Sequence, residues 1–332
     1  MKKILYLIFL MSFLCGCSSQ KYNFTYVDVF DTYSTLTIYS SNYKDSKTIS
    51  DDLHTELLKL NKLFDIYNNY KDLNNLKTVN DNAGLQPVKV DKNIIELLKA
   101  GKDAYYITDG TVNIAMGSVL EIWHNYRENA LNNGIFKIPS LNELQEANKH
   151  TDINSIIIDE KESTVYIKDK YTSIDVGAIA KGYSADFAAN YLKNKGITAA
   201  LLNLGGNVIC INDNKKENWK IGITSPEKPD EYIDKISISN QSAVSSGNYQ
   251  RYYEYNGKRY HHIIDGTTLY PSISNKGVTV ISDNSLKGDI FSTALFILPY
   301  EDGAELADKN NIQAIWITSD GNKYKTSQFN SN

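Results

Sequence analysis

Stretches in which apolar and polar residues alternate recur from one end of the chain to the other. Residues 25–39 alternate in this way and are rich in β-branched and aromatic side chains, as half-buried strands are. The same character predicts further strands, among them a hairpin, at 156–159, 164–167, 219–224, 234–238, 250–255, 258–263, 277–281 and 313–318. The pattern therefore predicts a strand-rich fold that begins near residue 25.

Segments of helical period lie between these strands. The leucines within residues 53–63 share one helical face, and helical spacing returns at 93–106 and 118–125. Ser140 and Glu143 have the spacing of a capping box, which predicts a short helix that ends near residue 149. No internal repeat or Pro-rich hinge interrupts the alternation. We therefore expect the α/β (mixed α+β) class, built as one compact unit that allows two lobes.

The middle of the chain is the densest region. It is predicted to contain a strand that ends at residue 174, a glycine-containing turn, a helix over 181–195 and a strand over 199–204. A helix N-terminus beside the flexible backbone of Gly177 and Gly182 is a natural place for phosphate oxygens. Glycines at such turns also serve chain geometry alone, so both interpretations stay open.

Two segments about 110 residues apart carry the residues best suited to chemistry, at 175–183 and 287–295. The second is predicted to be helical, so Asp289 and Thr293 share one face and present a carboxylate and a hydroxyl to the same spot. Hard oxygen ligands on a rigid element suit Mg²⁺, which completes its octahedron with water and substrate phosphates. The pair of segments therefore predicts a metal and phosphate site and indicates nucleotide chemistry.

The N-terminus has the features of a secretory signal. Two lysines precede an apolar run at residues 4–14 that is too short to span a bilayer. The run ends in Leu-Cys-Gly-Cys, which resembles the bacterial lipobox, so we expect a signal peptide over 1–16 and a lipid anchor on Cys17. A tether over 17–24 and a folded domain over 25–330 would follow, on the extracytoplasmic face of a bacterial membrane. An ordinary cleaved signal is the alternative, and it also places the protein outside the cytoplasm.

Composition limits the sources of stability and the class of partner. Apart from Cys17, the expected lipid anchor, Cys210 is the only cysteine beyond the expected signal, so no intramolecular disulfide is available and packing must stabilise the domain. The formal net charge of −4 is spread over mixed lysine and acidic residues without a long basic run. Nucleic acid is therefore excluded as an expected partner.

Several motifs follow one another in a fixed order after the signal. They are Phe30-Asp-Thr, Tyr70 ten residues before Asn80, Asp109-Gly-Thr-Val, Trp123, the segment 175–183, Asn203-Leu-Gly-Gly, Ser246-Gly-Asn-Tyr, the segment 260–265 (Tyr-His-His-Ile-Ile-Asp) and Asp289-x-x-x-Thr293. In this order they resemble the FAD:protein FMN transferases, the ApbE-type flavin-transferase lipoproteins. The resemblance covers nearly everything after the signal. It implies an ApbE-like, T-fold-related fold in a single compact unit with two lobes.

The resemblance also implies an activity and its residues. Members of that family split FAD at its pyrophosphate with Mg²⁺, join FMN through a phosphoester bond to a Ser or Thr hydroxyl of an acceptor protein, and release AMP. By resemblance, Asp289, Thr293 and the main-chain oxygen of Ala178 would hold the ion. The implied FAD-binding positions are Phe30, Tyr70, Ile107, Thr108, Asp109, Asp175 and Lys181. Core packing for the two aromatic residues, and turn formation for the two aspartates, are the structural alternatives.

The proton acceptor follows from the same resemblance. A hydroxyl attacks poorly unless a base takes its proton, and His262 is the candidate, with Asp265 as its possible orienting partner. A purely structural histidine is the alternative. The family usually continues this segment with Pro-Arg-Thr-Gly, whereas this chain has Gly-Thr-Thr-Leu at 266–269. Without the proline the loop is less stiff, and without the arginine a cation near the phosphates is lost. The departure therefore puts acceptor choice or rate in doubt more than it does FAD binding.

The expected function is that of a membrane-tethered flavin transferase. Its partners would be FAD and exported flavoproteins, or outward-facing domains of membrane redox complexes, with a Ser or Thr acceptor. Two other functions stay open: an FAD pyrophosphatase that uses water as the acceptor, and a non-catalytic FAD-binding lipoprotein.

Overall fold

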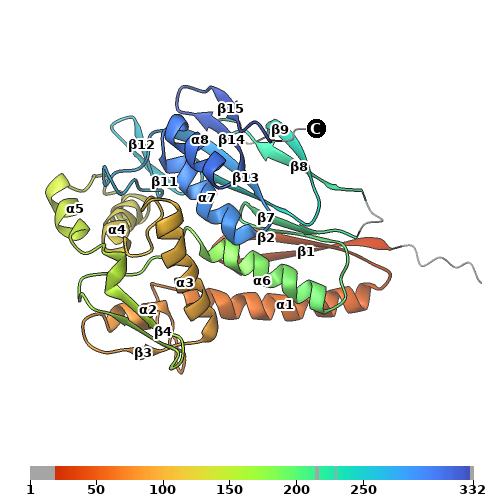
Figure 1. Cartoon of the computed structure of the whole chain (residues 1–332), viewed down its shortest axis with the longest axis horizontal. Helices are drawn as coiled ribbons and strands as arrows, with labels where there is room; N and C mark the ends of the chain where they lie inside the picture. Colours follow the sequence, from red (N-terminus) through yellow and green to blue (C-terminus); the bar gives the residue numbers. More distant parts are fainter. Residues whose placement is uncertain (1–18, 214–216, 229, 330–332) are drawn as a thin grey trace, which may run out of the picture.

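A large antiparallel sheet forms the centre of the protein in the computed structural model, which describes residues 19–213, 217–228 and 230–329. Figure 1 shows helices lying along the sheet and a smaller second lobe beside them. Its eight strands are, in spatial order, β1 (Gln20–Val29), β2 (Thr32–Ser40), β6 (Ala200–Leu204), β7 (Asn207–Ile211), β10 (Ser242–Gly247), β13 (Asn275–Ser282), β14 (Gln313–Thr318) and β15 (Lys323–Lys325). The expected signal 1–16 and Cys17 lie outside the described residues.

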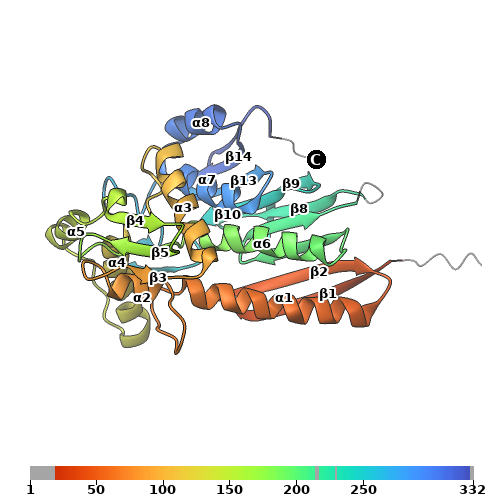
Figure 2. The ribbon, with the colours of Figure 1, turned by 60° about the horizontal axis from the view of Figure 1, so that its bottom comes forward.

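The two faces of this sheet are covered by different elements. Figures 1 and 2 show α1 (Tyr43–Phe64), α6 (Ala180–Asn194) and α7 (Ser285–Ile297) along one face, and α8 (Tyr300–Lys309) follows α7. The hairpin of β8 (Trp219–Thr224) and β9 (Tyr232–Ile238) packs on the other face. Alternate residues of each strand serve the two sides, because Ile209 packs with the helices and Cys210 with the hairpin.

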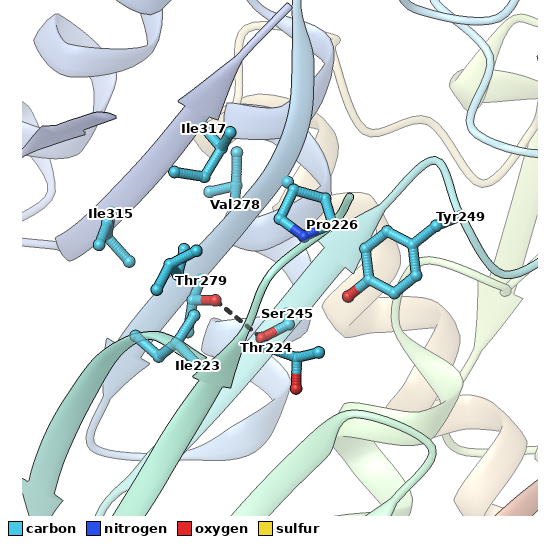
Figure 3. A pocket seen from close by; sticks show the side chains of 11 residues that line it. Ile223, Thr224, Pro226, Ser245, Tyr249, Val278, Thr279, Ile315 and Ile317 are labelled. Carbon is cyan, nitrogen blue, oxygen red and sulfur yellow. Dashed lines mark hydrogen bonds between the residues drawn. The ribbon is translucent and has the colours of Figure 1, made fainter. Parts of the chain in front are cut away.

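A small void remains between this hairpin and the sheet. Figure 3 shows Ile223, Pro226 and Tyr249 around it, beside a hydrogen bond of 2.8 Å between the hydroxyls of Ser245 and Thr279. Its volume of about 10 Å³ is about the space that one water molecule needs. The void is therefore a packing feature of the hairpin and is too small for a substrate.

The second lobe is built from shorter helices and strands. It contains α2 (Leu76–Asp81), β3 (Val88–Lys89), α3 (Lys92–Ile107), α4 (Gly117–Asn133), α5 (Leu141–Asn148), a 3-10 turn (Ile153–Ser155), β4 (Ile156–Asp159), β5 (Thr164–Ile167), β11 (Tyr252–Tyr255) and β12 (Lys258–His261). One apolar cluster, with Leu63, Ile94, Ile179 and Phe291 among its members, runs from this lobe into the helices over the large sheet. The two lobes are therefore joined by a shared core, and the mixed α+β class is confirmed.

Most predicted helices and strands are present, but the first strand begins earlier than predicted and one predicted strand is absent. Strand β1 begins at Gln20, so residues 20–24 belong to the sheet and not to the tether. The predicted strand that ends at Ile174 does not form, and Ser173 makes only an isolated bridge to Met116. The reason is a contact from a distant part of the sequence, because the Asn80 side chain binds both the N–H and the carbonyl of Ile174, at 2.8 and 3.0 Å. The predicted strand-turn-helix-strand unit is therefore wrong, and β6 instead pairs antiparallel with β2 and β7.

None of the helices in the described residues is long and apolar enough to cross a bilayer.

Candidate functional site

The loop that carries Asp175 is held from several sides. Asn80 fixes the preceding backbone, and the Asp175 N–H donates to the carbonyl of Ile114 at 2.9 Å. The Asp175 carboxylate accepts from the N–H of Gly177 at 2.7 Å. Burial raises the pKa of Asp175, while this N–H and the nearby charges of His124 and two arginines act in the opposite direction. The carboxylate is therefore a desolvated acceptor at a fixed position.

A reciprocal contact joins the N-terminal halves of α6 and α7. The Asp289 carboxylate in α7 accepts from the N–H of Gly182 in α6 at 2.8 Å. In return, the Asp186 carboxylate in α6 accepts from the N–H groups of Ser285 and Leu286 in α7, at 2.7 and 2.9 Å. A Cβ atom at Gly182 would lie only 2.6 Å from the Ser285 carbonyl oxygen. Glycine is therefore required for this approach of the two helices, which fixes the position of Asp289.

The buried Asp289 carboxylate has few hydrogen-bond partners. Burial raises its pKa, and the charge of Lys181, the Gly182 N–H and the Asn207 side chain oppose that shift. The Asn207 Nδ2 atom is itself buried and makes no hydrogen bond of normal geometry to the described residues. Buried polar atoms that lack partners are costly, so this corner of the site is suited to a polar ligand or a cation.

The donor set around Asp289 fits a hard cation. Within the described part of the chain, the Thr293 hydroxyl and the Ala178 carbonyl oxygen take part in none of the hydrogen bonds. Those residues contain no cluster of three or more His, Cys, Asp or Glu side chains that could hold a metal. One carboxylate, one hydroxyl and one carbonyl is the kind of partial oxygen set that Mg²⁺ accepts beside water and phosphate. The predicted ligands are thus compatible with that ion.

His262 lies immediately after β12 and is largely buried. Its Nδ1 atom has no hydrogen-bond partner among the described residues. Burial lowers its pKa to about 3, with the positive charges of Arg251, Lys181, His261 and Arg127 acting in the same direction. His262 is therefore neutral at physiological pH, which is the form that a proton acceptor needs, and its burial makes it a weaker base than a solvent-exposed histidine.

Asp265 does not bind His262, as the expected orienting partner would. Its carboxylate accepts from the N–H of Thr267 at 2.8 Å, and no hydrogen bond joins it to His262. It lines a cavity of about 490 Å³ together with Asp109 and the start of the 266–269 loop. The end of that loop is anchored by Trp123, whose Nε1 donates to the Leu269 carbonyl at 2.8 Å.

The aromatic residues after α1 divide into two environments. The Tyr70 hydroxyl donates to the Asp65 carboxylate at 2.7 Å, and the Lys62 ammonium lies over its ring, 5.7 Å from the centroid. The Tyr67 ring is 51% exposed, stacks on His124 at 4.5 Å between ring centroids, and is reached by the charge of Asp175. The charge of Asp175 therefore reaches Tyr67, whereas the Tyr70 hydroxyl is held by Asp65. Sequence analysis missed Tyr67, although it lies only three residues before Tyr70.

The remaining predicted FAD positions lie at turns. Phe30 has φ of +54° between β1 and β2 and is partly buried, and its N–H donates to the Asn61 side chain at 2.9 Å. Ile107 is exposed at the end of α3, and the Thr108 hydroxyl is used internally, since it donates to the Ala104 carbonyl at 2.7 Å. Asp109, with φ of +49°, is exposed and forms the turn. These positions are backbone corners at which a ligand could contact main-chain groups.

Two arginines near this site were also not among the residues predicted from the sequence. Arg127 on α4 donates to His124 Nδ1 at 2.8 Å, and Arg251 precedes β11. The charges of both arginines act on Asp175 and on His262. Neither arginine lies in a motif that suggests phosphate binding, so only the fold brings them to the site.

Comparison with known proteins identifies relatives along nearly the whole chain. The family model described as the ApbE family matches residues 30–316. The FAD:protein FMN transferase of Klebsiella pneumoniae (strain 342) is 34% identical over 280 residues, which are 80% of this chain and 83% of that protein. The FAD:protein FMN transferase of Treponema pallidum (strain Nichols) is 29% identical over 270 residues, 75% of this chain and 72% of that protein.

Solved structures have the same fold. An ApbE protein from Thermotoga maritima superposes with a TM-score of 0.83 at 26% identity, covering 93% of this chain and 97% of that chain. The flavin transferase ApbE from Vibrio cholerae superposes with a TM-score of 0.78 at 22% identity, covering 94% and 98%. The second likeness concerns the fold alone. Together they confirm the predicted ApbE-like fold.

Proposed function

Because the chain belongs to the ApbE family, we propose that it transfers FMN from FAD to a Ser or Thr hydroxyl of an acceptor protein. The observation that best supports this function is the position of Lys181, whose charge acts on both Asp289 and His262. A carboxylate suited to a cation and a neutral histidine suited to proton transfer therefore belong to one site.

The proposed reaction assigns a role to each group. The acceptor hydroxyl oxygen attacks the phosphorus of the FMN half, and the bond from that phosphorus to the bridging oxygen breaks. His262 takes the hydroxyl proton, and AMP leaves with the bridging oxygen and its electron pair. Lys181 stabilises negative charge on the phosphates. Asp289, Thr293 and the Ala178 carbonyl would hold Mg²⁺, which when bound neutralises phosphate charge and supports the leaving group.

The flavin nucleotide is proposed to bind along the turns that surround these groups. Asp175 would accept hydrogen bonds from ribose or base donors, and the Tyr67–His124 stack offers an exposed aromatic face for a ring system. The turns at Phe30 and at 107–109 would contribute main-chain contacts. Tyr70 keeps its place in this proposal only through Asp65, which its hydroxyl binds.

The localisation of the protein is part of the same proposal. A lipid on Cys17 would tether the enzyme to the outer face of a membrane, beside exported flavoprotein acceptors. Both the signal and Cys17 lie outside the described residues. Mass spectrometry of the membrane-extracted protein tests the tether: a chain that starts at an acylated Cys17 is expected, and an unmodified N-terminus would contradict it.

Release of AMP from FAD and Mg²⁺ tests the activity and separates its alternatives. We expect AMP release that depends on an exported flavoprotein domain carrying a threonine acceptor. AMP and free FMN without acceptor dependence would instead identify a pyrophosphatase. Tight FAD binding without AMP would identify a binding protein, and neither binding nor release would overturn the proposal.

A further inference from the structure

Arg251 connects two parts of the site that are far apart in the sequence. Its guanidinium donates to the carbonyl oxygens of Phe30 and Asp31, at 3.3 and 3.4 Å. Its own carbonyl oxygen accepts from the N–H of His262 at 3.1 Å. One residue therefore contacts the turn between β1 and β2 through its side chain and the strand before His262 through its backbone.

The turn that Arg251 contacts is one that needs support. Phe30 and Asp31 have φ values of +54° and +51°, a left-handed conformation that non-glycine residues rarely adopt. They are the two central residues of the hairpin turn, outside the strand pairing in which Val29 pairs with Thr32. One guanidinium nitrogen, Nη2, donates to both carbonyls. The planar guanidinium holds its N–H groups in fixed directions, whereas the N–H groups of a lysine ammonium rotate on a flexible stem.

The charge of Arg251 faces the same site. It acts on Asp175, on Tyr67 and on His262. The other groups that act on His262 are Lys181, His261 and Arg127, while the 266–269 loop contains no cation. Arg251 is exposed, so a ligand can reach its guanidinium from solvent.

We propose that Arg251 is a positioning residue of the transfer reaction, which holds the Phe30–Asp31 turn against the strand of His262 and supplies positive charge beside the bound FAD diphosphate. This inference rests on the proposed function. It assigns two separable properties to one side chain: the planar donor set fixes the turn, and the charge favours neutral His262 and an anionic ligand.

Two substitutions in the full-length chain separate these properties. Arg251→Gln removes both the charge and the planar donor set, and Arg251→Lys keeps the charge alone. Arg259→Gln is the matched control, because Arg259 is exposed on the same hairpin, where it lies over the Tyr252 ring at 4.0 Å. For each protein we would measure the dissociation constant of FAD, kcat and KM against pH, and the unfolding temperature.

Arg251→Gln is expected to weaken FAD binding about tenfold, as loss of a charge-assisted contact does, and to move the acid limb of the kcat profile to higher pH. Arg251→Lys should restore the acid limb but not the full FAD affinity. If Arg251→Gln and Arg259→Gln have the same FAD affinity and the same pH profile of kcat, the inference about Arg251 is overturned and the proposed function is not. A wild-type chain that neither binds FAD nor releases AMP would overturn the proposed function together with it. If Arg251→Gln unfolds, Arg251→Lys decides: wild-type affinity would contradict the role in the turn.

Discussion

Among single residues, Asp289 links stability to metal binding. Its folded-state pKa is raised by burial, so its ionised form destabilises the metal-free protein as pH rises above the unfolded value. Asp289→Asn should therefore leave the metal-free protein at least as stable at neutral pH, while Mg²⁺ no longer raises its unfolding temperature. Turnover should fall at least about 100-fold, because several kcal/mol of charge stabilisation are lost. Thermal unfolding with and without Mg²⁺ checks this, and a variant stabilised as well as the wild type would contradict it.

His262 should contribute a stability that depends on pH with the opposite sign. Its folded-state pKa is lowered to about 3, so the unfolded chain binds the proton first as pH falls. The stability of the wild type relative to His262→Gln should then decrease by roughly 1.4 kcal/mol per pH unit below about 6.5. Denaturant unfolding of both proteins at pH 7 and pH 5 measures this, with an expected change of about 2 kcal/mol. A constant difference would show that His262 is not desolvated.

Tyr67 and Tyr70 offer a direct comparison of two neighbouring aromatic residues. Tyr67→Leu should weaken FAD binding about tenfold, because a stacked face near Asp175 is lost. Tyr70→Leu should change affinity less, since its hydroxyl supports the Asp65 loop instead. FAD titration of both variants decides between them, and the reverse order of effects would restore Tyr70 as the ring contact.

Residue identity alone could predict the chemical types in this site but not every position. Asp175, Lys181, Asp289 and His262 lie in compact motifs, and the structure brings their charges into one region. The choice between Tyr67 and Tyr70 depends on how a loop turns after α1, which no short pattern encodes. The position of Arg251 in the site could not be predicted either, because its partners Phe30 and Asp31 are about 220 residues away in sequence.

Among the elements, the contact between α6 and α7 depends on one missing side chain. A Cβ at Gly182 would meet backbone atoms of α7 at 2.6 and 2.8 Å. Gly182→Ala should therefore destabilise the fold by about 1–3 kcal/mol, although alanine is the better helix former. It should also abolish stabilisation by Mg²⁺, because Asp289 is displaced.

Gly303→Ala is the matched control for this change. Gly303 also lies within a helix, α8, and a Cβ there would find its nearest atom at an ordinary 3.6 Å. This variant should be as stable as the wild type or more stable by up to about 1 kcal/mol. Denaturant unfolding compares the two, and equal effects of both alanines would contradict the requirement for close approach.

Helices with a strong hydrophobic period or a clear cap were predicted well, whereas segments whose conformation depends on contacts with other parts of the chain were not. The leucine pattern of α1 and the cap at Ser140 gave correct helices, since local sequence decides both. The strand before residue 175 failed because Asn80, about 95 residues earlier, satisfies that backbone. Strand β10 was missed because its serines, two of which bond to other hydroxyls, hide the strand pattern.

In the whole molecule, the candidate site lies where the two lobes meet. The large sheet contributes the turn of Phe30, α6 and α7 contribute Lys181 and Asp289, and the second lobe contributes His124. The mixed class and the two lobes could be predicted from the alternation of elements and the family resemblance. The order of strands in the sheet could not, because β2 pairs with β6 across more than 150 residues.

The central claim is that one site cleaves FAD and passes FMN to a protein hydroxyl. The most direct test is the intact mass of an exported flavoprotein domain with a threonine acceptor, after incubation with the full-length chain, FAD and Mg²⁺. The account predicts a gain equal to one covalently bound FMN, which is lost with Asp289→Asn or His262→Gln. An unchanged acceptor mass while the wild-type chain converts FAD to free FMN and AMP would contradict it.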